Sequence, residues 1–284
     1  MLQLLNFFLG QEYQITFSGP ASESSVSLDL ENMDIQKVPI QLNDPGFDTF
    51  LKELNPDIVL FDRFLTEEQF GWRIAEFAPN ALRILDTEDL HFLRKTREKA
   101  FRSSIEFTTD DWLKTDTCKR ELASIFRSDL SLMISSYEMH LLQEVVKIDK
   151  SILMHLPFML ESLKSETIAS WKSFEERKDF ICIGNGKHAP NVDAIVWLKN
   201  EIWHLIREQL PEAQLHIYGA YLPERINQMH NEKEGFLVHG WVEDVYSVME
   251  GTKINLAPLR FGAGLKGKLI DAMQNGTPSV TTNI

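Results

Sequence analysis

The residues best suited to chemistry lie in one short stretch near the C-terminus. A strand pattern ends at Pro258, a glycine-rich turn follows, and an amphipathic pattern predicts a helix from Gly264. Glycines let a backbone approach a ligand closely, and the exposed amides of a helix start attract an anion. Three cations stand at the same end: Arg260, Lys266 and Lys268. This combination predicts a binding site for a pyrophosphate group.

A carboxylate in the same segment extends the hypothesis to a sugar. Helical spacing would place Gly264, Lys268 and Asp271 on roughly one face. Asp271 could then accept hydrogen bonds from sugar hydroxyls while the turn holds phosphate. The plainer interpretation, a turn whose glycines only allow tight packing, stays open.

A second turn offers phosphate-facing groups in a similar setting. Residues 185–191 follow a strand pattern and precede a long helical one, and they contain Lys187 and Asn191. Lys187 is therefore a further candidate for contact with the oxygens of the anion. Asn191 either joins it or caps its own helix.

A cluster of polar residues opens the helical pattern of residues 91–102. Asp86, Glu88 and Asp89 precede His91, just after a strand pattern. The carboxyl end of a strand is where open α/β sheets keep ligands, so His91 is a candidate for chemistry. The alternative is a structural histidine, with Asp86 or Glu88 capping the helix. The spacing fits no metal-ligand set, so no metal site is expected.

The elements that must position these residues are short apolar runs alternating with longer amphipathic ones, typical of an α/β protein with mostly parallel sheets. Strands are expected at residues 14–18, 57–61, 83–86, 130–135, 152–156, 180–183, 214–218, 237–238, 254–258 and 279–281. Helices are expected at residues 1–9, 67–78, 91–102, 119–127, 137–145, 192–208, 244–249 and 264–275. A charged stretch, residues 161–178, is the expected linker between a domain of residues 1–160 and a domain of residues 179–284.

The composition sets the class of protein. Of 284 residues, 29 are Lys or Arg and 42 are Asp or Glu, and the net charge of −13 argues against nonspecific nucleic-acid binding. Two cysteines cannot build a disulfide framework, so a reducing, cytoplasmic setting is expected. No apolar run reaches the roughly 18 residues of a membrane span. Basic residues 94–102 form either a solvated helix face or a peripheral contact with the inner face of a membrane.

These motifs resemble the nucleotide-sugar loop of the group 1, family 4 glycosyltransferases, in the subgroup with an Arg-x-Gly-Ala-Gly-x-Lys-x-Lys pattern. The resemblance extends back through residues 183–194, 215–219 and 239–245. It implies the GT-B architecture, in which two Rossmann-like domains with parallel sheets face each other across a cleft. It also implies hexosyltransferase-like transfer from a nucleoside-diphosphate sugar to an unknown glycan, lipid-linked or small-molecule acceptor. Retention of anomeric configuration, no cofactor and no obligatory metal are further implications.

The resemblance assigns roles to residues that match the family pattern. The diphosphate would be held by Arg260, Gly264, Leu265, Lys266, Lys268 and Lys187, the ribose by Asp271, and the base by Gly240, Trp241 and Val242. His91 would face the reacting sugar, and Asp89 and Glu138 would lie on the acceptor side. Ser135 and Glu138 also form a capping box, which is a sufficient structural reason for that glutamate. Trp241 either stacks on the base or packs on the surface.

The sequence also departs from the family pattern. The first of two glutamates usually found eight positions apart is replaced by Ala263, and the second by Asp271. By comparison with the family, the chain opens without the first strand and its glycine turn, and it stops where a further helix is expected. Two alternatives therefore stay open: a nucleotide-sugar-binding module without catalysis, and an epimerase of nucleotide sugars.

Overall fold

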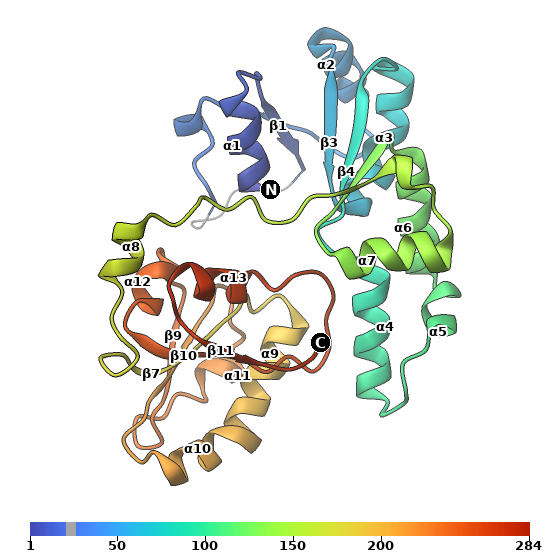
Figure 1. Ribbon diagram of the computed structural model, residues 1–284. Helices are drawn as coiled ribbons and strands as arrows, with labels where there is room; N and C mark the ends of the chain where they lie inside the picture. The colour runs from blue at the N-terminus through green and yellow to red at the C-terminus, as the bar shows by residue number, and fades with distance from the viewer. Residues whose placement is uncertain (21–26) are drawn as a thin grey trace. The chain divides into compact units, whose positions relative to one another are not determined.

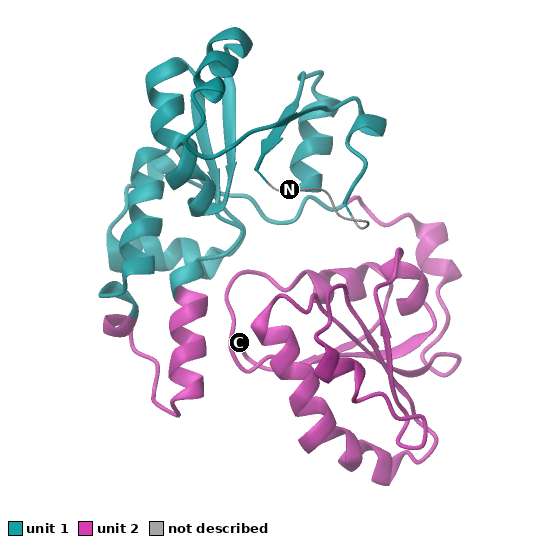
Figure 2. Cartoon of the chain, turned by 180° about the vertical axis from the view of Figure 1, so that it is seen from behind, with its two compact units in different colours: residues 1–92, 112–160 teal, residues 93–111, 161–284 magenta. Residues whose placement is uncertain are grey.

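The computed structural model describes residues 1–20 and 27–284, which form two compact units (Figure 1). The first unit comprises residues 1–92 and 112–160, and the second comprises residues 93–111 and 161–284 (Figure 2). Each unit has its own parallel sheet. The α/β class with parallel sheets, predicted from the alternation of apolar and amphipathic runs, is therefore confirmed.

The first unit is built on a four-stranded parallel sheet in the order β3–β4–β5–β6. Its strands are β3 (Ile58–Asp62), β4 (Leu82–Asp86), β5 (Leu130–Met133) and β6 (Leu153–His155). Its helices are α1 (Leu2–Gly10), α2 (Gly46–Leu54), α3 (Arg63–Phe77), α6 (Asp116–Arg127) and α7 (Ser136–Leu141), the last continuing into a π-helical turn at Leu142–Val146. Helices α4 (His91–Arg102) and α5 (Thr109–Leu113) each begin in one unit and end in the other.

A separate two-stranded sheet accompanies this core. The strand expected at residues 14–18 is β1 (Thr16–Gly19), and it pairs in parallel with β2 (Gln36–Pro39), which the sequence analysis did not predict. A cavity of about 700 Å³ is lined by residues of both this pair and β3. Its lining is largely apolar and includes Leu4, Phe17 and Leu60.

The second unit has a five-stranded parallel sheet in the order β11–β10–β7–β8–β9. Its strands are β7 (Lys178–Ile183), β8 (Leu215–Tyr218), β9 (Phe236–Gly240), β10 (Thr252–Ala257) and β11 (Ser279–Thr281). Successive side chains of β7 alternate between two cores: Phe180 and Cys182 pack with Trp203 of α10, whereas Ile181 packs with Met249 of α12. Both faces of the sheet are therefore covered, as a parallel sheet requires.

The helices of the second unit differ from their expected bounds. The single helix expected at residues 192–208 is α9 (Ala189–Trp197), a π-helical turn at Leu198–Ile202 and α10 (Trp203–Gln209). The remaining helices are α8 (Ser165–Ser170), α11 (Glu224–Asn227), α12 (Val245–Met249) and α13 (Gly267–Gln274). The helix expected from Gly264 thus begins at Gly267, so the stretch before it is a loop. Helix α8 lies within the stretch expected to be a linker.

Among the described residues, no helix is both long enough and apolar enough to cross a membrane.

Candidate functional site

The strand order of the second unit contains one switch point. Strand β7 is followed by β8 on one side, whereas β10, which comes later in the chain, lies on its other side. The strand order therefore reverses between β7 and β10. In open α/β sheets, ligands bind beyond the carboxyl ends of the strands at such a switch point. The two turns that the sequence analysis singled out, after Ile183 and after Ala257, both leave the sheet there.

The first turn is shaped by close packing between backbones. A Cβ atom on Gly186 would lie 2.2 Å from the Tyr221 carbonyl oxygen, and one on Gly184 would lie 2.5 Å from Asn191 Cγ. Real Cβ atoms do not approach other atoms so closely, so neither position accepts a side chain without movement. Lys187 Nζ lies 3.7 Å from the centre of the Tyr221 ring. Close backbone packing therefore accounts for glycine at these two positions.

Asn191 connects the first turn to the second. Its side-chain amide donates to the Asn185 carbonyl oxygen at 3.0 Å, and its Oδ1 accepts from Lys268 Nζ at 2.8 Å. Helix α9 is capped at His188 and begins at Ala189, so the prediction that Asn191 caps its helix is wrong. Burial lowers the pKa of Lys268. Lys268 is partly buried, and its bond to Asn191 links the two turns.

Arg260 is fixed by three neighbours. Its guanidinium forms a bidentate ion pair with Asp193, at 2.8 Å from Nε and 2.7 Å from Nη2. Its Cζ lies 4.6 Å from the ring centre of Phe101 and 5.0 Å from that of Trp197. A planar guanidinium paired at its edge and covered by aromatic rings is strongly oriented. Arg260 therefore contributes its charge from a fixed position, together with the neighbouring charge of Asp193.

The glycine-rich stretch is a loop and not the start of the helix that the sequence predicted from Gly264. Gly264 has φ +67°, a left-handed conformation that favours glycine. Gly262 is different, since a Cβ added there would approach only Ile284, at 3.7 Å. Lys266 is the N-cap residue of α13, and Leu265 is exposed. Because α13 begins at Gly267, Gly264 does not share a helical face with Lys268 and Asp271 as expected.

Polar and aromatic residues on α13, on α12 and in the segment before α12 are of types that contact nucleosides. Burial raises the pKa of Asp271, which is half-buried on α13. Burial also raises the pKa of Tyr246 on α12, and the nearby Asp271 carboxylate adds to this effect. Trp241 is 55% exposed and follows Gly240, which has φ +82°. Val242 comes next in the chain. Both interpretations of Trp241, base stacking and packing on the surface, stay predictions.

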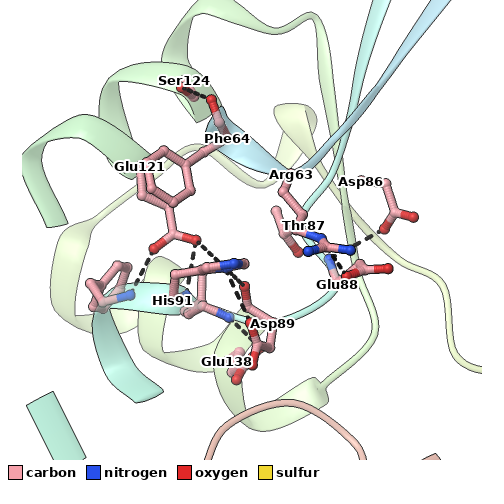
Figure 3. Close-up of polar contacts among 12 residues, drawn as sticks. Arg63, Phe64, Asp86, Thr87, Glu88, Asp89, His91, Glu121, Ser124 and Glu138 are labelled. Carbon is pink, nitrogen blue, oxygen red and sulfur yellow. Dashed lines mark hydrogen bonds and ion pairs between the residues drawn. The ribbon is translucent and has the colours of Figure 1, made fainter. Parts of the chain in front are cut away.

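In the first unit, His91 is the first residue of α4 and lies among carboxylates (Figure 3). His91 Nδ1 is 3.2 Å from the Asp89 carbonyl oxygen, 3.2 Å from Asp89 Oδ1 and 3.6 Å from Glu121 Oε1. The Phe64 ring and the imidazole are nearly perpendicular, with 5.4 Å between ring centres. These contacts fix the ring orientation and direct Nδ1 toward negative charge.

Two buried glutamates hold the start of α4. Glu121 on α6 accepts from the His91 amide at 3.0 Å and the Phe92 amide at 2.9 Å, and Glu138 on α7 accepts from the Leu90 amide at 3.3 Å. Each is 1% exposed. Carboxylates at a helix N-terminus satisfy its first amides and interact favourably with its dipole. The Glu138 amide also donates to Ser135 Oγ at 3.3 Å, so Ser135 caps α7 and the serine half of the predicted capping box is confirmed.

Glu121 and Arg63 were not predicted from the sequence. Arg63 opens α3 with φ +67°, and its Nε lies 2.7 Å from Glu88 Oε2, whose residue also has a positive φ of 56°. Glu88 therefore pairs with Arg63 rather than capping α4. Burial raises the pKa of Asp86 nearby. Among the described residues, no group of three or more His, Cys, Asp or Glu side chains could hold a metal ion.

Comparisons with known proteins agree with the fold. The family model described as glycosyl transferases group 1 matches residues 177–284. No sequence among curated proteins matches the chain significantly.

Solved structures match more of the chain, at low sequence identity. A Staphylococcus aureus TarM variant, in complex with fondaparinux, α-GlcNAc-glycerol and UDP, is 14% identical, with a TM-score of 0.60 over 84% of this chain and 44% of that one. A glycosyltransferase from Rickettsia africae is 11% identical, with a TM-score of 0.61 over 100% and 74% of the two chains. Anabaena HepE in complex with UDP is 10% identical, with a TM-score of 0.64 over 99% and 77%.

The chain spans less than half the length of the TarM structures that it matches. Structural similarity at this level of sequence identity establishes a shared fold. The chain therefore has the α/β fold of GT-B glycosyltransferases, with two Rossmann-like domains, and its residues 177–284 match the group 1 glycosyltransferase family model.

Proposed function

We propose that this chain transfers a sugar from a nucleoside-diphosphate sugar to a glycan, lipid-linked or small-molecule acceptor, with retention of anomeric configuration. The observation that carries the proposal is the switch point between β7 and β10, with a turn leaving the sheet on each side of it. The family match covers the same residues. Neighbours in fold bind UDP, which supports a nucleotide as the donor's leaving group.

The proposed roles follow from the chemistry of breaking the donor's sugar–phosphate bond. Negative charge develops on the diphosphate as it leaves, and oriented amides and cations stabilise that charge. The amides of Gly264, Leu265 and Lys266 and the Lys266 side chain are the proposed direct contacts. Arg260 and Lys268 already bind Asp193 and Asn191, respectively. Their proposed contribution is therefore positive charge near the loop and not direct contact with the diphosphate.

The nucleoside would lie along α12 and α13. Asp271 would accept hydrogen bonds from the ribose hydroxyls, while Trp241 and the backbone of Gly240 and Val242 would hold the base. Tyr246, exposed beside Asp271, is an added candidate for the same surface. His91 is proposed to face the reacting sugar, and Asp89 to contribute to the acceptor side. Neither a metal nor a cofactor is part of this proposal.

Calorimetric titration of the full chain with UDP and GDP tests the first step. We expect a saturable heat for at least one of them, and no heat at millimolar concentration would overturn the proposal. Incubation with a panel of nucleotide sugars and glycan acceptors then tests transfer. Product stereochemistry, read from the anomeric proton coupling by NMR, tests retention.

Two outcomes would assign a different function to the same site. Nucleotide binding without transfer or donor hydrolysis would indicate a binding module without catalysis. Ala263, where the family has a glutamate, is the residue that favours this alternative. Conversion of a nucleotide sugar to its epimer without acceptor would indicate an epimerase.

A further inference from the structure

Helix α4 supplies a side chain that holds the glycine-rich loop within the second unit. Arg97 Nη1 donates to the Gly262 carbonyl oxygen at 2.9 Å. On its other side, the Arg97 guanidinium lies 5.5 Å from the centre of the Phe107 ring. One turn further along α4, Phe101 contacts Phe261, with 5.5 Å between ring centres. The loop is therefore attached to α4 through two consecutive residues, Phe261 and Gly262.

The hydrogen bond from Arg97 sets the direction of a peptide unit. A trans peptide is planar, so the N–H of one residue points opposite to the carbonyl of the residue before it. With the Gly262 carbonyl directed at Arg97, the Ala263 amide points away from that guanidinium. Glycine has little intrinsic preference between backbone conformations, so this peptide needs an outside contact to keep one orientation.

We propose that Arg97 is a positioning residue for the diphosphate of the donor, an inference that rests on the proposed function. By holding the Gly262 carbonyl, Arg97 keeps its partial negative charge away from the anion and presents the Ala263 amide as a donor.

Binding of UDP and GDP to three full-length variants tests this role. Arg97→Met should weaken binding of the diphosphate roughly tenfold, the equivalent of one lost hydrogen bond to a charged group. Arg102→Met is the matched control, since Arg102 lies on the same helix, is exposed and pairs with Glu98 at 2.7 Å. It carries the same change of charge, and we expect less than a twofold effect.

The third variant separates positioning from a general structural role. Gly262→Ala limits the freedom of the peptide, and the structure has room for the added Cβ, whose closest neighbour is Ile284 at 3.7 Å. Added to Arg97→Met, Gly262→Ala should raise the affinity for the nucleotide at least about threefold above that of Arg97→Met alone, because alanine limits the conformations of the loop. Thermal unfolding midpoints should stay equal among the variants.

The outcomes distinguish the two proposals. If the unmodified chain binds neither UDP nor GDP, the proposed function fails and the role of Arg97 fails with it. If the unmodified chain binds but Arg97→Met and Arg102→Met lose affinity equally, only the positioning role is overturned. Failure of Gly262→Ala to restore any affinity would also overturn it.

Discussion

Lys266 should contribute more to diphosphate binding than Lys187. Lys266 is the N-cap residue of α13, where its charge and the positive end of the helix dipole favour the same anion. A hydrogen bond to a charged group contributes roughly 1.5–3 kcal/mol, so Lys266→Ala should weaken UDP binding by about 10- to 150-fold.

The other lysine starts from a less favourable position. Lys187 Nζ lies 3.7 Å from the Tyr221 ring centre, and a cation–π contact at an exposed site is worth about 0.5–1 kcal/mol. Lys187 gives up that contact when it reaches a phosphate, so the net effect of Lys187→Ala should be smaller, below about fivefold.

Calorimetric titration of both variants at fixed ionic strength measures the difference, since screening changes with salt. Lys253→Ala is the matched control. It removes the same charge from the same unit, but Lys253 lies at the amino end of β10 and its Nζ is 4.6 Å from the Phe174 ring centre. Equal losses for Lys266→Ala and Lys187→Ala, or a larger loss for the latter, would place the phosphate in the other turn.

Three further predictions concern stability. Glu121→Ala leaves two amides of α4 without their carboxylate and should reduce the unfolding free energy of the first unit by roughly 1–3 kcal/mol in urea titrations; an unchanged midpoint would show that water replaces it. Burial lowers the pKa of His216 and of His239, and the charges of His216 and His230 lower that of His239 further, whereas Asp179 opposes the shift at His216. As the pH falls, these histidines therefore take up protons at a higher pH in the unfolded chain than in the folded one. The melting temperature of the second unit should fall as the pH drops below about 6.5, and His239→Gln should flatten the dependence of melting temperature on pH. Gly219→Ala places a Cβ 2.0 Å from the Gly184 carbonyl oxygen and should destabilise the second unit by roughly 1–3 kcal/mol or more. Gly10→Ala is the control, because a Cβ there has no atom within 4 Å and should not destabilise the protein. Similar melting curves for the two variants would contradict this packing argument.

Local patterns predicted most of the strands because a buried parallel strand is a continuous apolar run. The run at residues 57–61 became β3, and that at residues 180–183 became the last four residues of β7. Strand β2 was missed because apolar and polar residues alternate only weakly in Gln36–Pro39. Its described partner is β1, so the strand depends on a pairing that its own sequence does not reveal. The helix predicted from Gly264 begins later because the left-handed φ of that glycine is incompatible with a helical turn.

The site residues could be chosen by type, but their partners could not. Arg260 and Asp193 are 67 positions apart, and the Arg97 contact with Gly262 spans 165. No local spacing rule reaches such distances. Glu121 was missed for a related reason. A glutamate in a helix is usually exposed to solvent, and the amides that Glu121 binds at the start of α4 are about 30 positions away in the sequence. The positive φ of Arg63 likewise has no signal in its residue type.

The position of β3 has a consequence for local opening of the first unit. In a parallel strand, every second residue directs its N–H to the same neighbour, and among the described strands β3 has only β4 beside it. The amides of β3 that face away from β4 adjoin the cavity and should exchange their hydrogen with deuterated solvent long before those of β4, which is paired on both sides. An edge of this kind also offers a template to other extended chains.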